Sequence, residues 1–204
     1  MENFIHPTAV ISDDVTLGHG NYIGPYCYIT GKAVIGNNNR FEAYCSIGTP
    51  PEHRDHFGSS PFNVIIGNNN TIREFVTINS GTVRNTILGN GIVMLKNSHV
   101  GHDSIIEDKV NLSCNVLIGG HSHIMEGANL GLGAMCHQFL VIGAYAMIGM
   151  GGIVVKSSVI QPGEIHVGNP VKFLKENKVG LQRNNIDSNK LLELTNRYFL
   201  LSNK

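Results

Sequence analysis

Three histidines and an aspartate are the side chains of this sequence best suited to chemistry, because a short repeat brings them together. They are His102, Asp103, His121 and His137, all within Ser98–Phe139, where an apolar residue recurs at every sixth position. If three hexads make one turn of a triangular prism, residues eighteen apart stack on coils about 4.8 Å apart. The three imidazoles then fall on one ridge within roughly 10 Å of each other. Imidazoles can transfer protons near neutral pH or bind metal ions, so this ridge is the candidate active site.

The hexad repeat extends over most of the chain and predicts the fold. The repeat is interrupted twice, at residues 49–64 and at residues 84–87. Its longest unbroken run follows, from Leu88 to His166. So short a period predicts an all-β hexapeptide-repeat solenoid, in which three short strands per coil each turn one apolar side chain inward. We therefore expect a parallel β-helix over residues 1–170, with a loop insertion at 49–64.

Past Pro170 the hexads stop, and residues 171–204 are predicted to form a short basic helical tail. Within it, Asp187–Ser202 has the pattern of one amphipathic α-helix, with Asp187 or Ser188 as its N-cap. From Lys172 onward the tail carries seven Lys and Arg against three Asp and Glu. This charge suggests an anionic partner, such as a diphosphate or an acidic carrier protein, although an ordinary solvated helix would look similar.

Composition excludes several classes of function. The formal net charge is zero and only 15% of residues are charged, which gives no indication of nucleic-acid binding. No apolar run approaches the ~18 residues of a membrane span, and the first twenty residues lack the features of a signal peptide, so a cytoplasmic protein is expected. The four cysteines form no CxxC pair, which argues against a zinc ribbon or a secreted disulfide framework.

Several stretches between Ile72 and Ile153 resemble one family of enzymes. IREFVTINSGT, NSHVGHDSIIED, NVLIGGH and MCHQFLVIGAYAMIGMGG are similar to the UDP-N-acetylglucosamine 3-O-acyltransferases of lipid A (lipopolysaccharide) biosynthesis. The resemblance implies a homotrimer of left-handed β-helices with active sites between neighbouring subunits; the left hand is expected on this ground alone. It also implies transfer of a 3-hydroxyacyl group from acyl carrier protein to a sugar hydroxyl.

The resemblance also implies roles for individual residues. His102 matches the general base, Asp103 its acidic partner, and Gly120 the backbone N–H donor to the thioester oxyanion. The positions that match the sugar and acyl site are His99, His121, His137 and Gln138, and those that match nucleotide contacts are Asn177 and Arg183. No bound cofactor or metal is implied, since the acyl group arrives on the phosphopantetheine of a carrier protein or on coenzyme A. Met150 stands where glycine would admit long acyl chains, which predicts a short or medium chain.

Three alternatives remain open. The segment PPEHRDHF, Val179 and the single-helix tail differ from the family pattern, and they favour a paralogue that uses acyl-coenzyme A for O- or N-acylation of another nucleotide sugar. A zinc enzyme like the hexapeptide-repeat carbonic anhydrases would need histidines where Met135 and Gln138 stand. A trimeric scaffold without activity would not need His102, Asp103 and Gly120 together. The remaining histidines, including His53, are assigned no role.

Overall fold

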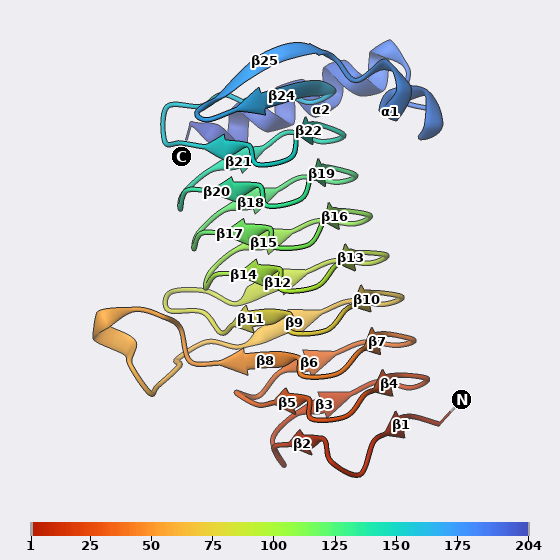
Figure 1. Ribbon diagram of the computed structural model, residues 1–204, viewed down its shortest axis with the longest axis vertical. Coiled ribbons are helices and arrows are strands. Elements are labelled where there is room, and N and C mark those ends of the chain that lie inside the picture. The colour runs from red at the N-terminus through yellow and green to blue at the C-terminus, as the bar shows by residue number, and fades with distance from the viewer. Residues whose placement is uncertain (1, 204) are drawn as a thin grey trace.

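The computed structural model describes residues 2–203, which form a left-handed parallel β-helix of about nine coils with a short helical region at one end (Figure 1). Each coil contributes one strand to each of three sheets, here called A, B and C. Sheet A contains β1 (Phe4–Ile5), β4 (Tyr22–Ile23), β7 (Arg40–Phe41), β10 (Thr71–Ile72), β13 (Val93–Met94), β16 (Asn111–Leu112), β19 (Asn129–Leu130), β22 (Met147–Ile148), β24 (Glu164–Gly168) and β25 (Val171–Glu176). Sheet B contains β2 (Val10–Ile11), β5 (Tyr28–Ile29), β8 (Ser46–Thr49), β11 (Thr77–Asn79), β14 (His99–Val100), β17 (Leu117–Ile118), β20 (Met135–Cys136) and β23 (Ile153–Val154). Sheet C contains β3 (Thr16–Leu17), β6 (Val34–Ile35), β9 (Val64–Ile66), β12 (Thr86–Leu88), β15 (Ile105–Ile106), β18 (His123–Ile124) and β21 (Val141–Ile142).

The hexad positions form the core, as the repeat predicts. Val100 of β14 lies opposite Ile118 of β17, which in turn lies opposite Cys136 of β20, so residues eighteen apart stack. Val100 and Ile118 have no exposed surface. One inward residue per strand therefore fills the prism, and the outward residues and the corners are left to carry function.

Both interruptions of the repeat leave the prism at the same corner, where sheet B passes into sheet C. Residues 50–63, with a 3₁₀ turn at Arg54–His56, connect β8 to β9 and project from the corner (Figure 1). Residues 80–85 connect β11 to β12. Because β12 still pairs in register with β9 and β15, the additional residues form loops without disturbing the sheet.

The tail differs in part from its predicted helical structure. Val171–Glu176 forms β25, which pairs antiparallel with β24. The last coil would otherwise leave the unpaired N–H and C=O groups of a strand edge exposed, and β25 pairs with them. Helices α1 (Lys178–Arg183) and α2 (Ser188–Ser202) follow.

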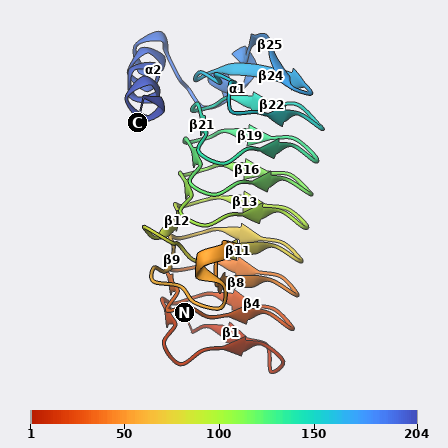
Figure 2. The same cartoon turned by 90° about the vertical axis from the view of Figure 1, so that its left-hand side faces the viewer.

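Helix α2 confirms the predicted C-terminal helix. The Asp187 side chain caps it by accepting from the backbone N–H of Lys190 at 2.8 Å. Its buried residues Leu194 and Tyr198 pack beside β21 of sheet C (Figure 2). Neither helix is long and apolar enough to cross a bilayer, and the same holds throughout residues 2–203.

Candidate active site

The centre of the candidate site is a buried histidine–aspartate pair at the corner between β14 and β15. His102 Nδ1 lies 2.6 Å from Asp103 Oδ2. His102 is 9% exposed and Asp103 is fully buried. Asp103 has φ of 63°, the left-handed conformation that turns the chain at this corner and that Asp tolerates better than most residues. The backbone turn thus directs the carboxylate back towards the neighbouring imidazole.

A loop of the preceding coil holds the Asp103 carboxylate. Oδ1 accepts backbone N–H groups from Thr82, Val83 and Arg84, each at 2.9 Å, and Oδ2 accepts the Thr82 hydroxyl at 2.6 Å. Burial by itself would raise the pKa of Asp103, but these bonds and the one from His102 outweigh it and hold the pKa well below its usual range. An ionised carboxylate can only accept, so His102 Nδ1 is the donor and its Nε2 carries the free lone pair.

Nothing in the sequence assigned a role to these three loop residues. They lie in the 80–85 loop, one coil below Asp103, and only Arg84 falls within the interruption predicted at residues 84–87. The signal that could have identified them is the break in the hexad repeat, because it adds residues at the same corner of the prism as the candidate site.

Gly120 lies directly against the free edge of His102. A Cβ on Gly120 would stand 2.9 Å from both Cε1 and Nε2 of that imidazole, closer than real side chains approach. Glycine is therefore required for packing against the ring. Glycine thus lets the backbone at residue 120 lie beside the imidazole edge, where the family resemblance expects an oxyanion donor next to a general base.

Two further imidazoles surround His102. The His121 ring lies edge-on at 5.1 Å between centroids, stacks on Phe139 at 4.4 Å, and places Nε2 3.4 Å from Asp103 Oδ2. Burial lowers the pKa of His121, although the nearby Asp103 charge opposes this. His53 comes from the 50–63 loop and lies 5.7 Å from His102 between ring centroids. The sequence assigned His53 no role, because the path of a 14-residue loop cannot be read from the repeat.

His137, Gln138 and His99 lie around this centre rather than within it. His137 and Gln138 are exposed, and the His137 ring bonds through Nδ1 to the backbone oxygen of Gln138 at 2.9 Å. The predicted ridge joined His102, His121 and His137, whereas the imidazoles that the structure shows next to His102 are those of His121 and His53, and His137 is exposed. His99 lies on sheet B, bonded to Thr77 Oγ1 at 2.8 Å, and burial lowers its pKa.

His102, Asp103 and His121 also offer metal-ligand atoms within 4.8 Å of one another. Both carboxylate oxygens of Asp103, however, already accept hydrogen bonds from the chain. The donor set thus resembles a hydrogen-bonded catalytic pair more than a preformed metal site.

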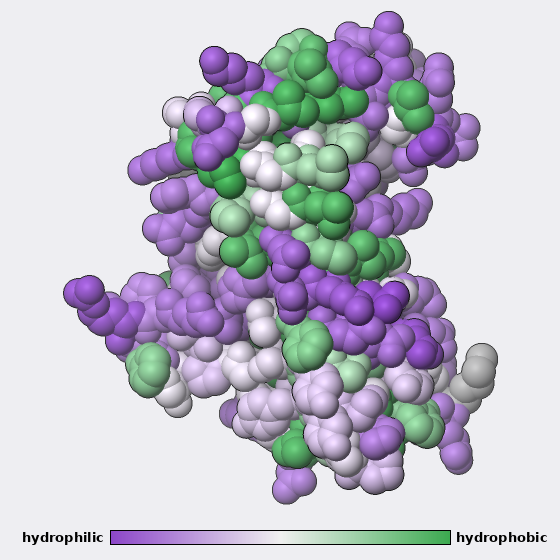
Figure 3. Space-filling view, in the orientation of Figure 1, coloured by the Kyte–Doolittle hydropathy of each residue, from purple (hydrophilic) through white to green (hydrophobic). Residues whose placement is uncertain are grey.

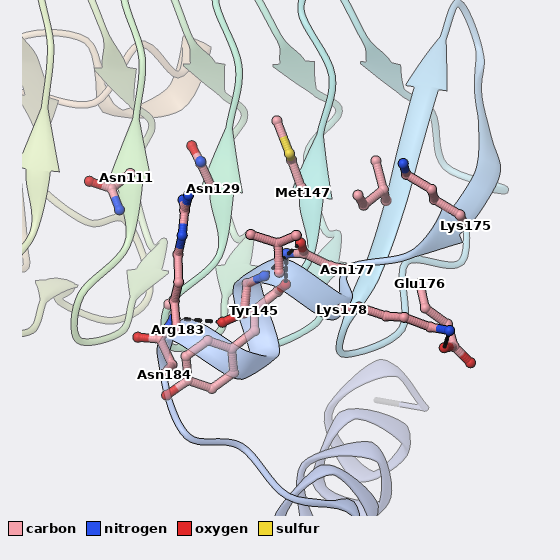
Figure 4. Close-up of a pocket in the computed structure, with 14 residues that line it drawn as sticks. Asn111, Asn129, Tyr145, Met147, Lys175, Glu176, Asn177, Lys178, Arg183 and Asn184 are labelled. Carbon is pink, nitrogen blue, oxygen red and sulfur yellow. Dashed lines mark hydrogen bonds and ion pairs between the residues drawn. The ribbon is translucent and has the colours of Figure 1, made fainter.

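Sheet A and the protruding 50–63 loop lie on opposite sides of the prism (Figure 1). A second concave site lies against sheet A. This cleft of about 760 Å³ carries Lys175, Lys178 and Arg183, and Arg183 extends from α1 across strands of sheet A (Figure 4). Asn177 caps α1 by accepting from the Gly180 N–H at 3.1 Å, and its amide donates to the Tyr145 carbonyl at 2.8 Å. The cleft thus brings together both residues predicted to contact a nucleotide.

Met150 is separate from both places. It follows β22 at the corner between sheets A and B, and 75% of its surface is exposed. The family resemblance predicts that Met150 lies along the acyl chain, and among residues 2–203 of a single chain its side chain is left largely uncovered.

No model of a known protein family matches the sequence. Among curated proteins, the acyl-[acyl-carrier-protein]–UDP-N-acetylglucosamine O-acyltransferase of Burkholderia lata is 35% identical over 159 residues, which are 76% of this chain and 60% of that protein. The protein of the same name from Sinorhizobium fredii is 40% identical over 131 residues, 63% of this chain and 48% of its own length. The chain thus spans about 60% or less of these curated relatives.

Solved structures match over more of their length. The UDP-N-acetylglucosamine O-acyltransferase of Moraxella catarrhalis superposes with a TM-score of 0.80 at 30% identity, covering 95% of this chain and 82% of that one. The Francisella novicida UDP-N-acetylglucosamine acyltransferase has a TM-score of 0.80 at 27% identity, covering 96% and 78%. The likeness extends over nearly the whole described fold.

Proposed function

Because the chain belongs to the UDP-N-acetylglucosamine O-acyltransferase family, we propose that it transfers an acyl group from a carrier thioester to a hydroxyl of a UDP-linked amino sugar. The observation that carries the proposal is the buried His102–Asp103 pair with Gly120 packed against His102 Nε2. The reaction requires a base for the sugar hydroxyl and a donor for the thioester oxygen, and these residues supply both side by side.

In this mechanism His102 Nε2 accepts the proton of the sugar hydroxyl as its oxygen attacks the thioester carbonyl carbon. The carbonyl oxygen becomes an oxyanion that accepts the Gly120 N–H. Asp103 remains ionised and stabilises the imidazolium through Nδ1. When the intermediate collapses, the C–S bond breaks and the imidazolium returns its proton to the leaving thiolate, giving acyl sugar and free thiol.

The assembly that completes the site is a homotrimer. Within one chain, His102 and the cationic cleft at Arg183 lie on different parts of the prism, so one substrate spans both only where two chains meet. Exposed apolar residues on sheet B and its border with sheet A support such contacts: Leu117 (41%), Leu132 (49%), Met135 (43%) and Met150 (75%). In Figure 3, apolar patches lie over the upper coils, above a hydrophilic band. Sedimentation at micromolar concentration should give three times the chain mass, and a monomer would contradict this assembly.

The donor is proposed to be an acyl carrier protein in the cytoplasm, with a short or medium acyl chain limited by Met150. The acyl-carrier-protein donor is named in the curated relatives. A second candidate is an acyl-coenzyme A donor with another nucleotide sugar. It rests on the 50–63 loop, whose sequence departs from the family pattern and whose His53 ring lies beside His102.

The test is to incubate the protein with UDP-N-acetylglucosamine and a panel of acyl carrier proteins and acyl-coenzyme A esters, and to weigh the products. His102→Ala should lower turnover about 10²–10⁴-fold without changing the fold or assembly. His19→Ala, at an exposed position in the early coils, is the matched control and should keep full activity. Residual activity above a tenth of wild type in His102→Ala would place the base elsewhere.

A further inference from the structure

Two imidazoles at the corner of the candidate site compete for one carboxylate. His102 Nδ1 lies 2.6 Å from Asp103 Oδ2, and His121 Nε2 lies 3.4 Å from the same oxygen. A positively charged His121 would donate to this oxygen in competition with His102, and it would repel an imidazolium at His102. The proposed mechanism therefore requires His121 to stay neutral while His102 takes the proton of the sugar hydroxyl.

The side chain of Arg84 reaches both of the backbone turns involved. Its Nε donates to the carbonyl oxygen of Asp103 at 2.7 Å, and its Nη2 lies 3.5 Å from the carbonyl oxygen of His121. Asp103 and His121 hold equivalent places on successive coils, with φ of 63° and 60°. The guanidinium thus bridges the coil that carries the proposed base and the coil that carries Gly120, the proposed oxyanion donor.

The loop that carries Arg84 is itself fixed to this corner. The backbone N–H of Arg84 donates to Asp103 Oδ1 at 2.9 Å. A Cβ at Gly81 would stand 1.6 Å from the Arg84 carbonyl oxygen, so this tight turn requires glycine. The Gly81 carbonyl in turn accepts the hydroxyl of Ser60, from the 50–63 loop, at 3.2 Å. The Arg84 side chain therefore extends from a backbone that is held in place.

The groups around His121 act on its charge in opposite directions. Burial is the largest influence and lowers the pKa of His121, whereas the Asp103 carboxylate raises it. The charges of His102, Arg84 and His53 all lower it. Of these three residues, Arg84 is the one that is cationic at every pH, because a guanidinium does not lose its proton in proteins. Its charge therefore disfavours an imidazolium at His121, which has no direct bond to the carboxylate as short as that of His102.

Resting on the proposed function, we infer that Arg84 is a positioning residue of the acyl transfer, which holds the two turns together and keeps His121 neutral. The Asp103 carboxylate then serves His102 alone. Arg84 acts through these groups rather than by touching the substrate. The hexad repeat gave no indication of this role, because Arg84 lies in an interruption of the repeat.

The test compares Arg84→Gln, which loses the charge, with Arg84→Lys, which keeps the charge but loses the planar fork. In the pH profile of kcat/KM, Arg84→Gln should lose activity at a higher pH than wild type on the acid side, because His121 is protonated more readily. Arg84→Lys should keep the wild-type profile. Arg40→Gln is the matched control, since Arg40 is an exposed arginine on sheet A, and it should leave both rate and profile unchanged.

The rates at neutral pH test the positioning role. Arg84→Gln should lower kcat about tenfold, because the two coils lose their bridge, while KM for both substrates stays within about twofold. An acid side of the profile that is the same in wild type and Arg84→Gln would overturn the inference. A raised KM with unchanged kcat would make Arg84 a substrate-binding residue and would overturn it as well.

A titration without substrate separates this inference from the proposed function. The pKa of His121, followed by NMR of the labelled imidazole, should rise in Arg84→Gln and stay as in wild type in Arg84→Lys. If this result is obtained while wild type transfers no acyl group from any donor, the influence of Arg84 on His121 is supported and the acyltransferase is refuted. If acyl transfer occurs and the pKa of His121 is the same in wild type and Arg84→Gln, the inference alone is refuted.

Discussion

Replacing Asp103 by Asn tests how the site is built, because the two side chains have nearly the same shape. The amide oxygen of Asn can still accept the three backbone N–H groups that now reach Asp103 Oδ1. Its NH₂ group, however, would face His102 Nδ1, which could bond to it only as an acceptor. The imidazole would then carry its proton on Nε2, the wrong tautomer for a base. We expect kcat to fall about 10²–10⁴-fold, equivalent to about 3–5 kcal/mol in the barrier.

The same change should affect stability in a pH-dependent way. Charge-assisted bonds to the carboxylate become neutral ones, which should cost about 2–4 kcal/mol in the free energy of unfolding. Since the pKa of Asp103 is held below its usual range in the folded state, its contribution is fully present above the unfolded value of about 3.9. That contribution is lost as pH falls through the folded pKa, so wild type and Asp103→Asn should converge in acid.

The assays are single-turnover acyl transfer near neutral pH and denaturant unfolding from neutral pH to well below about 3.9, the unfolded pKa of Asp. Thr82→Val is the matched control: it removes only the hydroxyl bond to Oδ2, and should cost about 1–2 kcal/mol and less than tenfold in kcat. If Asp103→Asn keeps more than half of the wild-type kcat, the carboxylate does not set the tautomer of His102 and the reasoning is wrong.

Two further changes test the acyl site and the tail. Met150→Gly should shift the preferred donor to longer chains, with each additional buried methylene contributing about 0.8 kcal/mol, and identical chain-length profiles would make Met150 only a surface residue. Arg197 of α2 pairs with Glu107, which directly follows β15, so Arg197→Ala should weaken the attachment of α2 by about 1 kcal/mol. We expect faster hydrogen exchange in α2 alone. Burial would raise the pKa of Glu107, but His123 and Arg197 hold it below its usual value. Hydrogen exchange in α2 of wild type should therefore also become faster as pH falls below about 4.3, where Glu107 begins to lose its charge. A pH-independent protection of α2 would contradict this pairing.

The family, the solenoid and the His102–Asp103 pair were accessible from the sequence for different reasons. Three hexads, such as those from Val100 to Ile118, make one coil and encode the fold directly, because the stacked neighbour of each inward residue lies eighteen positions away. The same count put Asp103 beneath His121, which the structure confirms at 3.4 Å. The role of His102 came only from the resemblance of its motif, and it stays a prediction.

Counting failed wherever the chain leaves the repeat. The loop that holds Asp103 and the loop that brings His53 to His102 both arise from interruptions, whose paths depend on hydrogen bonds and packing with residues of other coils. β25 likewise forms because β24 leaves an open strand edge with which it pairs. The local sequence of Val171–Glu176 does not predict this pairing. The sequence by itself determined the periodic part, where one residue's surroundings are a fixed number of positions away. Only the tertiary structure decided the non-periodic contacts, because their partners lie at separations that no repeat specifies.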